Sequence, residues 1–121
     1  MERDGEWVVK QVIGDINKFS RYVLIPDHPS DKDKIFRDSM GYGIEDAQEL
    51  LDIYIAQVRE KFAHKEYAIE LRDQYGQRFT IEIELTGKGA VADRTYRVLS
   101  GWILDSNGTL KLSTPFTGFA S

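Results

Sequence analysis

Cysteine is absent from this sequence of 121 residues, and histidine occurs only twice, as His28 and His64. The lack of cysteine excludes a disulfide framework and thiolate zinc sites, and two histidines cannot build a multi-histidine metal cluster. The sequence also lacks G-x-x-x-x-G-K-[ST], H-E-x-x-H and G-x-S-x-G motifs, and it has no G-x-G-x-x-G between a strand and a helix. We therefore expect chemistry that needs neither a metal nor another cofactor.

Long apolar runs are missing too, since none approaches the roughly 18 residues of a membrane-spanning helix. A chain of this length should form one domain, with an N-terminal arm and short helix over 1–26 and an α+β core over 27–121. The formal net charge of −4 argues mildly against an extensive nucleic-acid surface. The acid is concentrated in residues 41–60, which hold five carboxylates and a single arginine.

The stretch 79–116 predicts three consecutive antiparallel strands. Apolar and polar residues alternate over 79–85, which is typical of a strand with one buried face. In residues 94–104 apolar side chains occur at both even and odd positions, so both faces of this strand should be covered and we expect it at the centre of the sheet. Ser106-Asn107-Gly108 is a strong hairpin signal, and Pro115 should end the third strand because it cannot donate to the ladder.

Upstream of this stretch, the apolar spacing predicts helices. Asp15 can cap a short helix that stops at Pro26, and a second short helix should run from about residue 31 to Met40. The clearest helix extends from Ile44 to about Phe62, with an apolar stripe: Ala47, Leu50, Leu51, Tyr54, Val58 and Phe62. Residues 67–71 alternate as a fourth, edge-like strand would. We therefore expect an α+β fold in which N-terminal helices pack on one face of a three- to four-stranded antiparallel meander sheet.

The polar residues that remain suit the cleavage of RNA. That reaction needs a base for the 2′-hydroxyl proton, an acid for the leaving 5′-oxygen, and cationic or hydroxyl donors around the pentavalent phosphate. One histidine, one lysine and two or three hydroxyls can supply these groups. The chain holds such a set of candidate catalytic residues: His28, Lys34, Ser100, Ser113 and Thr114. Candidate phosphate-binding residues are Lys32, Arg94 and Arg97.

The order of several short motifs resembles a known family. The motifs are D-H-P-S-D-K-D-K-I-F at 27–36, M-G-Y-G at 40–43, Y-G-Q-R-F at 75–79, L-T-G at 85–87, V-L-S-G-W-I at 98–103 and L-K-L-S-T at 110–114. In that order they resemble the C-terminal toxin domain of contact-dependent inhibition and filamentous-haemagglutinin-like proteins. That domain is similar to the barnase–EndoU–colicin–RelE ribonuclease superfold. Residue 31 is aspartate where the family prefers glycine.

The resemblance implies a metal-independent ribonuclease toxin that cuts tRNA or another RNA and is neutralised by a cognate immunity protein. It also implies delivery from a secreted or cell-surface bacterial effector into the cytoplasm of a target cell, and a cytoplasmic location when the toxin is bound to its immunity protein.

Other interpretations of the same residues stay open. Ser100 lies among apolar residues, so it could be a buried serine bonded to the backbone. Arg94 and Arg97 could pair with Glu82 and Glu84 across a hairpin instead of holding phosphates. The whole domain could be a non-catalytic immunity or adaptor module that uses its acidic helix, or a toxin that needs a translation elongation factor.

Overall fold

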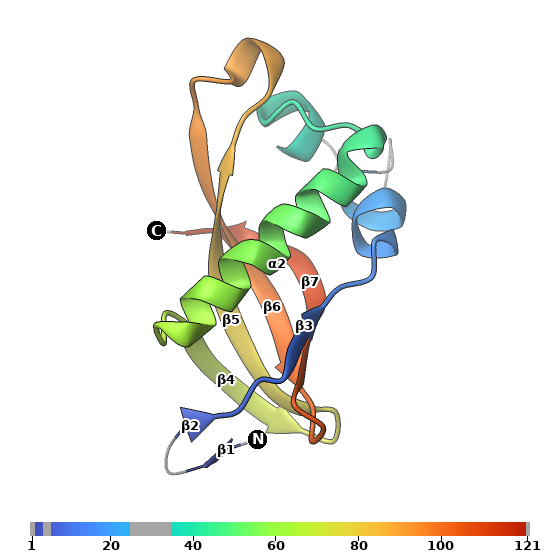
Figure 1. Cartoon of the computed structure of the whole chain (residues 1–121). Helices are drawn as coiled ribbons and strands as arrows, with labels where there is room; N and C mark the ends of the chain where they lie inside the picture. The colour runs from blue at the N-terminus through green and yellow to red at the C-terminus, as the bar shows by residue number, and fades with distance from the viewer. Residues whose placement is uncertain (1, 4–5, 25–34, 121) are drawn as a thin grey trace.

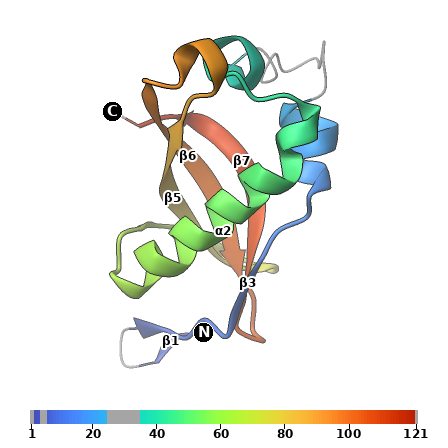
Figure 2. The same ribbon diagram turned by 45° about the horizontal axis from the view of Figure 1, so that its top comes forward.

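The computed structural model describes residues 2–3, 6–24 and 35–120. Its main feature is a five-stranded sheet in the order β3-β7-β6-β5-β4, crossed on one face by helix α2, Ala47–Ala63 (Figure 1, Figure 2). The strands of this sheet are β3 (Gln11–Ile13), β4 (Ala68–Asp73), β5 (Gly76–Thr86), β6 (Thr95–Leu104) and β7 (Thr109–Phe119). A separate two-stranded antiparallel sheet, β1 (Glu2–Arg3) and β2 (Glu6–Trp7), lies in the N-terminal arm. Short helical turns are η1 (Phe19–Val23), η2 (Ile35–Ser39), η3 (Ile44–Asp46) and η4 (Gly89–Val91).

The antiparallel order β5-β6-β7 and the central place of β6 confirm the strand predictions for residues 79–116. The predicted hairpin at Ser106-Asn107-Gly108 joins β6 to β7. Gly108 has φ +83° there, a left-handed conformation that favours glycine. Asp105 Oδ1 accepts the backbone N–H groups of Asn107 and Thr109, at 2.8 and 3.0 Å. The turn is therefore fixed by both its glycine and its aspartate.

The predicted long helix is confirmed, since η3 leads directly into α2. All six residues of its predicted apolar stripe are buried. They pack on alternate residues of the sheet, including Phe79, Ile81 and Ile83 of β5. Gly43 N–H donates to Asp46 Oδ2 at 2.9 Å, which caps the first turn of the helix. One long helix and one sheet face therefore form the core.

The predicted fold class is wrong in its sheet and in its helices. The sheet is mixed and has five strands, because β3 pairs in parallel with β7, placing Val12 opposite Leu110. A three-residue strand is too short to show a period, and a parallel partner at the far end of the chain leaves no hairpin signal. The predicted strand at 67–71 is present as the edge strand β4.

The helices before α2 are short where the structure describes them, so the prediction that several N-terminal helices cover the sheet is wrong: α2 is the one long helix of the described residues. Asp15 Oδ1 accepts Asn17 N–H at 2.9 Å, as predicted for a cap, and the helical stretch that follows covers only 17–23, ending in η1. In the second region residues 31–34 lie outside the described residues, and Ile35–Ser39 form η2, which is helical as predicted. These segments bury Phe19, Phe36 and Met40.

Pro115 does not end the third strand as predicted, because β7 continues to Phe119. The register with β6 shifts between the pair Gly101–Thr114 and the pair Leu99–Gly118, so Pro115 lies in a bulge where no ladder donor is required. The carbonyl oxygen of Pro115 accepts the Tyr54 hydroxyl at 2.9 Å. Burial raises the pKa of the Tyr54 hydroxyl, which therefore stays a neutral donor that ties α2 to this bulge.

Candidate functional site on the open sheet face

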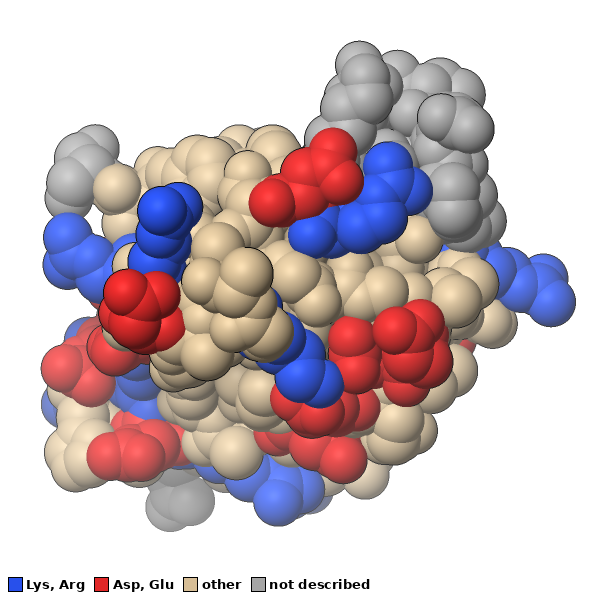
Figure 3. Space-filling model, turned by 90° about the horizontal axis from the view of Figure 1, so that it is seen from above, with Lys and Arg blue, Asp and Glu red and all other residues tan. Residues whose placement is uncertain are grey.

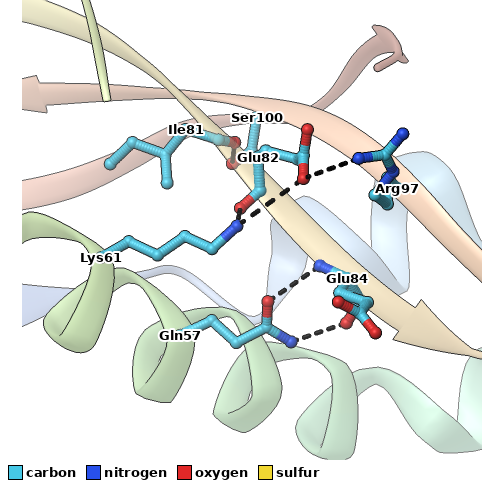
Figure 4. Close-up of polar contacts among 7 residues, drawn as sticks. All are labelled: Gln57, Lys61, Ile81, Glu82, Glu84, Arg97 and Ser100. Atoms are coloured by element: carbon cyan, nitrogen blue, oxygen red, sulfur yellow. Dashed lines mark hydrogen bonds and ion pairs between the residues drawn. The ribbon is translucent and has the colours of Figure 1, made fainter. Parts of the chain in front are cut away.

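Glu82 lies on the face of the sheet opposite α2, because strand side chains alternate and its neighbours Ile81 and Ile83 point into the core. Its side chain is 35% exposed. Two cations approach the same carboxylate oxygen, Oε2: Lys61 Nζ from α2 and Arg97 Nη1 from β6, each at 3.9 Å (Figure 4). Three elements, α2, β5 and β6, therefore meet at this carboxylate.

The carboxylate oxygens of Glu82 are open to a further hydrogen-bond partner. At 3.9 Å neither cation is close enough to donate a hydrogen bond to it. No other residue of the described chain donates a hydrogen bond to a carboxylate oxygen of Glu82. The two positive charges nevertheless lie near enough to attract an anionic group placed beside the carboxylate.

Lys61 is held in place by the backbone of β5. Its Nζ donates to the carbonyl oxygen of Glu82 at 2.5 Å. One helical turn earlier, the amide of Gln57 accepts Glu84 N–H at 2.8 Å and donates to Glu84 C=O at 2.6 Å (Figure 4). The pairing of β4 with β5 reaches only to Thr80, so these side chains take the place of a neighbouring strand along the rest of the edge.

A hollow of about 320 Å³ adjoins this carboxylate on the open face. It is lined by residues of α2, of the chain leading into β4, and of β4, β5 and β6: Lys61, Glu66, Tyr67, Ala68, Thr80, Glu82 and Leu99. The Thr80 hydroxyl at its edge donates to Glu70 Oε2 at 2.6 Å. The hollow thus combines the Glu82 carboxylate with the ammonium of Lys61, while Arg97 approaches the same carboxylate from β6. No three His, Asp or Glu side chains of the described residues gather as a metal site would require.

Of the residues that the sequence predicted for catalysis, the structure describes only the three hydroxyl residues. His28, Lys32 and Lys34 lie outside the described residues. Ser100 is 0% exposed: its hydroxyl donates to the carbonyl oxygen of Ile81 and accepts the indole N–H of Trp102, both at 2.8 Å. This placement matches the alternative interpretation of a buried serine bonded to the backbone, and it leaves Ser100 no contact with a substrate.

Ser113 and Thr114 line a separate hollow of about 410 Å³, together with Asp15, Asn17 and Lys18. The two hydroxyl residues do lie together, at the point where β7 extends beyond the short strand β3. Ser100 is not among the residues that line this hollow. The structure therefore places the predicted hydroxyls in two different environments.

The two predicted arginines also differ. Arg97 approaches Glu82, which confirms the alternative prediction of a cross-strand ion pair for this residue. Arg94 is exposed in the connection from β5 to β6, where its carbonyl oxygen accepts Gly87 N–H at 2.9 Å. Arg97 is therefore the one of the two that joins the candidate site.

Sequence reasoning missed Lys61 and Gln57 and treated Glu82 only as an ion-pair partner. Their signal was present: Gln57 and Lys61 are spaced i, i+4 beside the apolar stripe of α2, so they occupy one flank of the helix. The sequence pattern did not predict that this flank of α2 lies over the unpaired edge of β5.

Two of the acidic side chains in residues 41–60 form hydrogen-bonded ion pairs within the protein. Lys88 Nζ donates to Asp46 Oδ1 at 2.8 Å and to Glu49 Oε1 at 2.9 Å. The hydrogen bond from Lys88 lowers the pKa of Asp46, and the same two carboxylates raise the pKa of Lys88. Acidic and basic side chains are interspersed over the face of the molecule seen in Figure 3. Lys88 therefore neutralises part of the acid at the N-terminal end of α2.

A family profile described as "Domain of unknown function (DUF6883)" matches residues 6–118. The chain belongs to the DUF6883 family. The matched range contains β2 through nearly all of β7, and so every described residue of the Glu82 site. No curated protein and no solved structure matches the chain significantly. Within the described part of the chain, no helix is long and apolar enough to span a membrane.

Proposed function

We propose that this DUF6883 domain cleaves RNA without a metal ion, with Glu82 as the general base and Lys61 and Arg97 as the phosphate-binding cations. The proposal rests on one observation: a carboxylate with no hydrogen-bond donor of its own lies between two cations beside a hollow on the open face of the sheet. A phosphodiester is anionic, and its pentavalent transition state carries more negative charge than the substrate. Two cations beside the phosphate therefore favour the transition state over the substrate.

The reaction proceeds by transfer within the RNA chain. Glu82 takes the proton of a 2′-hydroxyl, the 2′-oxygen bonds to the adjacent phosphorus, and the bond from phosphorus to the 5′-oxygen breaks. The leaving 5′-oxygen takes a proton from an acid, which is the role that we propose for His28. The products are a 2′,3′-cyclic phosphate and a 5′-hydroxyl, so the mechanism requires no water, oxidant or cofactor in this step.

The biological role that we propose follows from the resemblance of the sequence motifs. In it the domain is a toxin of bacterial competition, released from a secreted or cell-surface effector into the cytoplasm of a target cell. A cognate immunity protein binds the domain in the producing cell, and tRNA is the first substrate to test. The acidic-helix adaptor is the competing proposal, and the engagement of Asp46 and Glu49 by Lys88 weakens it.

The decisive experiment compares Glu82→Gln with Glu84→Gln in the cleavage of tRNA and total RNA in the presence of EDTA. The two glutamates lie on the same strand and the same face, but both described cations approach Glu82. Loss of a general base lowers the rate by about 10²–10⁴-fold, so Glu82→Gln should be nearly inactive and Glu84→Gln close to wild type.

Two results would contradict the proposal: RNA left intact by the wild-type protein, or equal rates for the two variants. His28→Ala tests the acid in the same assay. If the wild-type protein leaves RNA intact but captures a protein that is lost on replacing Glu45, Glu49 and Asp52 by lysine, the adaptor function replaces the nuclease.

A further inference from the structure

A groove of about 490 Å³ lies between the N-terminal arm and the C-terminal end of α2. Aromatic side chains and cations line it together. Trp7 and Tyr67 meet edge to face with ring centroids 6.2 Å apart, and the cations are Lys10, Arg59 and Lys65. Phe62 stacks on Tyr67 and backs the groove from the core side. The lining therefore offers both flat apolar surface and positive charge.

The charge of the groove is opposite to that of the whole chain. The formal net charge of the protein is −4, yet among the described residues three cations and no carboxylate line this groove. Glu60, which follows Arg59, and Glu66, which follows Lys65, line other hollows. Within the described residues, the side chains of Lys10 and Arg59 form no ion pair or hydrogen bond. A local positive groove on an acidic protein indicates an anionic ligand.

The groove adjoins the candidate catalytic hollow. Tyr67 lines both the groove and the hollow beside Glu82, so the two sites meet at this ring. Lys61 and Arg59 leave the same turn of α2, one toward each site. A strand that occupies the groove and passes over Tyr67 would arrive at Glu82.

We propose that the groove binds a single-stranded segment of the RNA substrate, with bases against Trp7 and Tyr67 and phosphates at Lys10 and Arg59. The inference rests on the proposed function for the identity of its ligand. Sites for single-stranded nucleic acid combine aromatic stacking platforms with a basic track in this way. The indole N–H of Trp7 is buried and donates to no acceptor among the described residues, so no polar contact fixes the orientation of this ring.

Binding can be measured without cleavage by using a short oligouridylate with 2′-O-methyl groups, which has no 2′-hydroxyl nucleophile. Fluorescence anisotropy of the labelled oligonucleotide gives the affinity. We expect Trp7→Leu to weaken binding roughly tenfold, since loss of one stacking platform has about that effect. The intrinsic fluorescence offers a second readout, because the other tryptophan, Trp102, is buried in the core. Oligonucleotide should quench the wild-type protein, and Trp7→Leu should abolish the quenching.

The salt dependence tests the cations. Each phosphate contact contributes about 0.7 to the slope of log affinity against log salt for a single strand. Lys10→Gln with Arg59→Gln should therefore make the slope shallower by about 1.4. Arg21→Gln is the matched control, because Arg21 is exposed in η1 and lines none of the hollows described above. An unchanged slope and affinity in the double variant would overturn the proposal.

The groove assignment and the catalytic assignment can be refuted independently. Glu82→Gln should bind the oligonucleotide as the wild-type protein does, while the groove variants should raise KM for RNA and leave kcat nearly unchanged. If the wild-type protein binds the oligonucleotide through the groove but cuts no RNA, the proposed function fails and the groove assignment stands. If it cuts RNA and the groove variants have a wild-type KM, the groove assignment fails alone.

Discussion

Replacing Ser100 by alanine tests whether this residue is structural or catalytic. Its hydroxyl is 0% exposed and forms two hydrogen bonds of 2.8 Å, as donor to Ile81 O and as acceptor from Trp102 Nε1. In Ser100→Ala the indole N–H of Trp102, a residue only 1% exposed, loses its acceptor in the core.

The expected loss of stability follows from these two bonds. A buried donor left unsatisfied costs about 1–3 kcal/mol, and the lost bond to Ile81 O contributes about 1 kcal/mol more. Ser100→Ala should therefore lower the free energy of unfolding by about 2–4 kcal/mol. At roughly 4 °C per kcal/mol for a domain of this size, the melting temperature should fall by about 8–16 °C.

Urea unfolding followed by tryptophan fluorescence measures this change. The midpoint should fall while the m-value stays constant, because the surface exposed on unfolding is nearly the same. Trp102→Phe removes the donor, so it should cost less in the Ser100→Ala background than in the wild type, and the cycle gives the coupling directly.

Ser113→Ala is the matched control, with an expected change within about 0.5 kcal/mol because Ser113 is only half-buried. Below its melting temperature, Ser100→Ala should retain cleavage of RNA. If Ser100→Ala were as stable as Ser113→Ala but inactive, the structural role argued here would be refuted and the catalytic one restored.

Three further perturbations test other parts of the fold by urea unfolding. Gln57→Ala should cost about 1–2 kcal/mol and promote aggregation, because it removes two bonds to the backbone of β5 and uncovers a strand edge. Gly76→Ala should cost about 3 kcal/mol or prevent folding, since Gly76 has φ +138° and a Cβ would lie 2.1 Å from a backbone oxygen of β6. Gly89→Ala is the control: Gly89 has φ +61° but open space around it, so this change should cost about 1–2 kcal/mol. The hydrogen bond from Lys88 lowers the pKa of Asp46 below its unfolded value. The stability that this bond contributes is therefore complete above the unfolded pKa and is lost as the pH falls through the lower folded pKa. The free energy of unfolding of Asp46→Asn should depend less on pH in that acidic range. An Asp46→Asn profile parallel to the wild type would show that Lys88 does not stabilise the folded carboxylate.

The sequence predicted the parts of this fold that depend on residues close together in the chain. The apolar stripe of α2 repeats at helical spacing, and every member of it is buried. The strands β5, β6 and β7 follow one another through local turns, so alternation and an Asn-Gly signal were enough to order them. In each case the information lies within one element or one turn.

The sequence could not predict the parts that depend on distant pairing. The strand β3 has three residues, and its partner β7 lies about a hundred positions further along the chain. The extension of β7 beyond Pro115 depends on a bulge, which is a property of two strands together and not of the proline alone. A short apolar cluster such as the one around Phe19 predicts burial correctly, but it does not give the length of the helical segment that carries it.

For the same reason, the sequence predicted only part of the candidate site. The parity that buries Ser100 beside Val98 and Trp102 also exposes Arg97, and it follows from the strand period alone. The meeting of Arg97 with Lys61 depends instead on where the helix crosses the sheet, which no local pattern encodes. Residue types could therefore supply candidates for the site, while the tertiary arrangement decides which of the described candidates lie together.

The position of α2 joins stability and the proposed activity in one element. Its apolar stripe fixes the helix on the core face, and this places the adjacent flank, Gln57 and Lys61, over the unpaired edge of β5. Through the carbonyl of Glu82, Lys61 satisfies the strand edge, and the same ammonium lies 3.9 Å from the carboxylate. The Lys61 ammonium is thus oriented by a hydrogen bond to the backbone before any substrate binds. None of the binding energy of the substrate is therefore needed to order this cation. A shift of the helix by one turn would keep the apolar stripe partly buried but remove this cation, and so the position of α2 is constrained by the site as well as by the core.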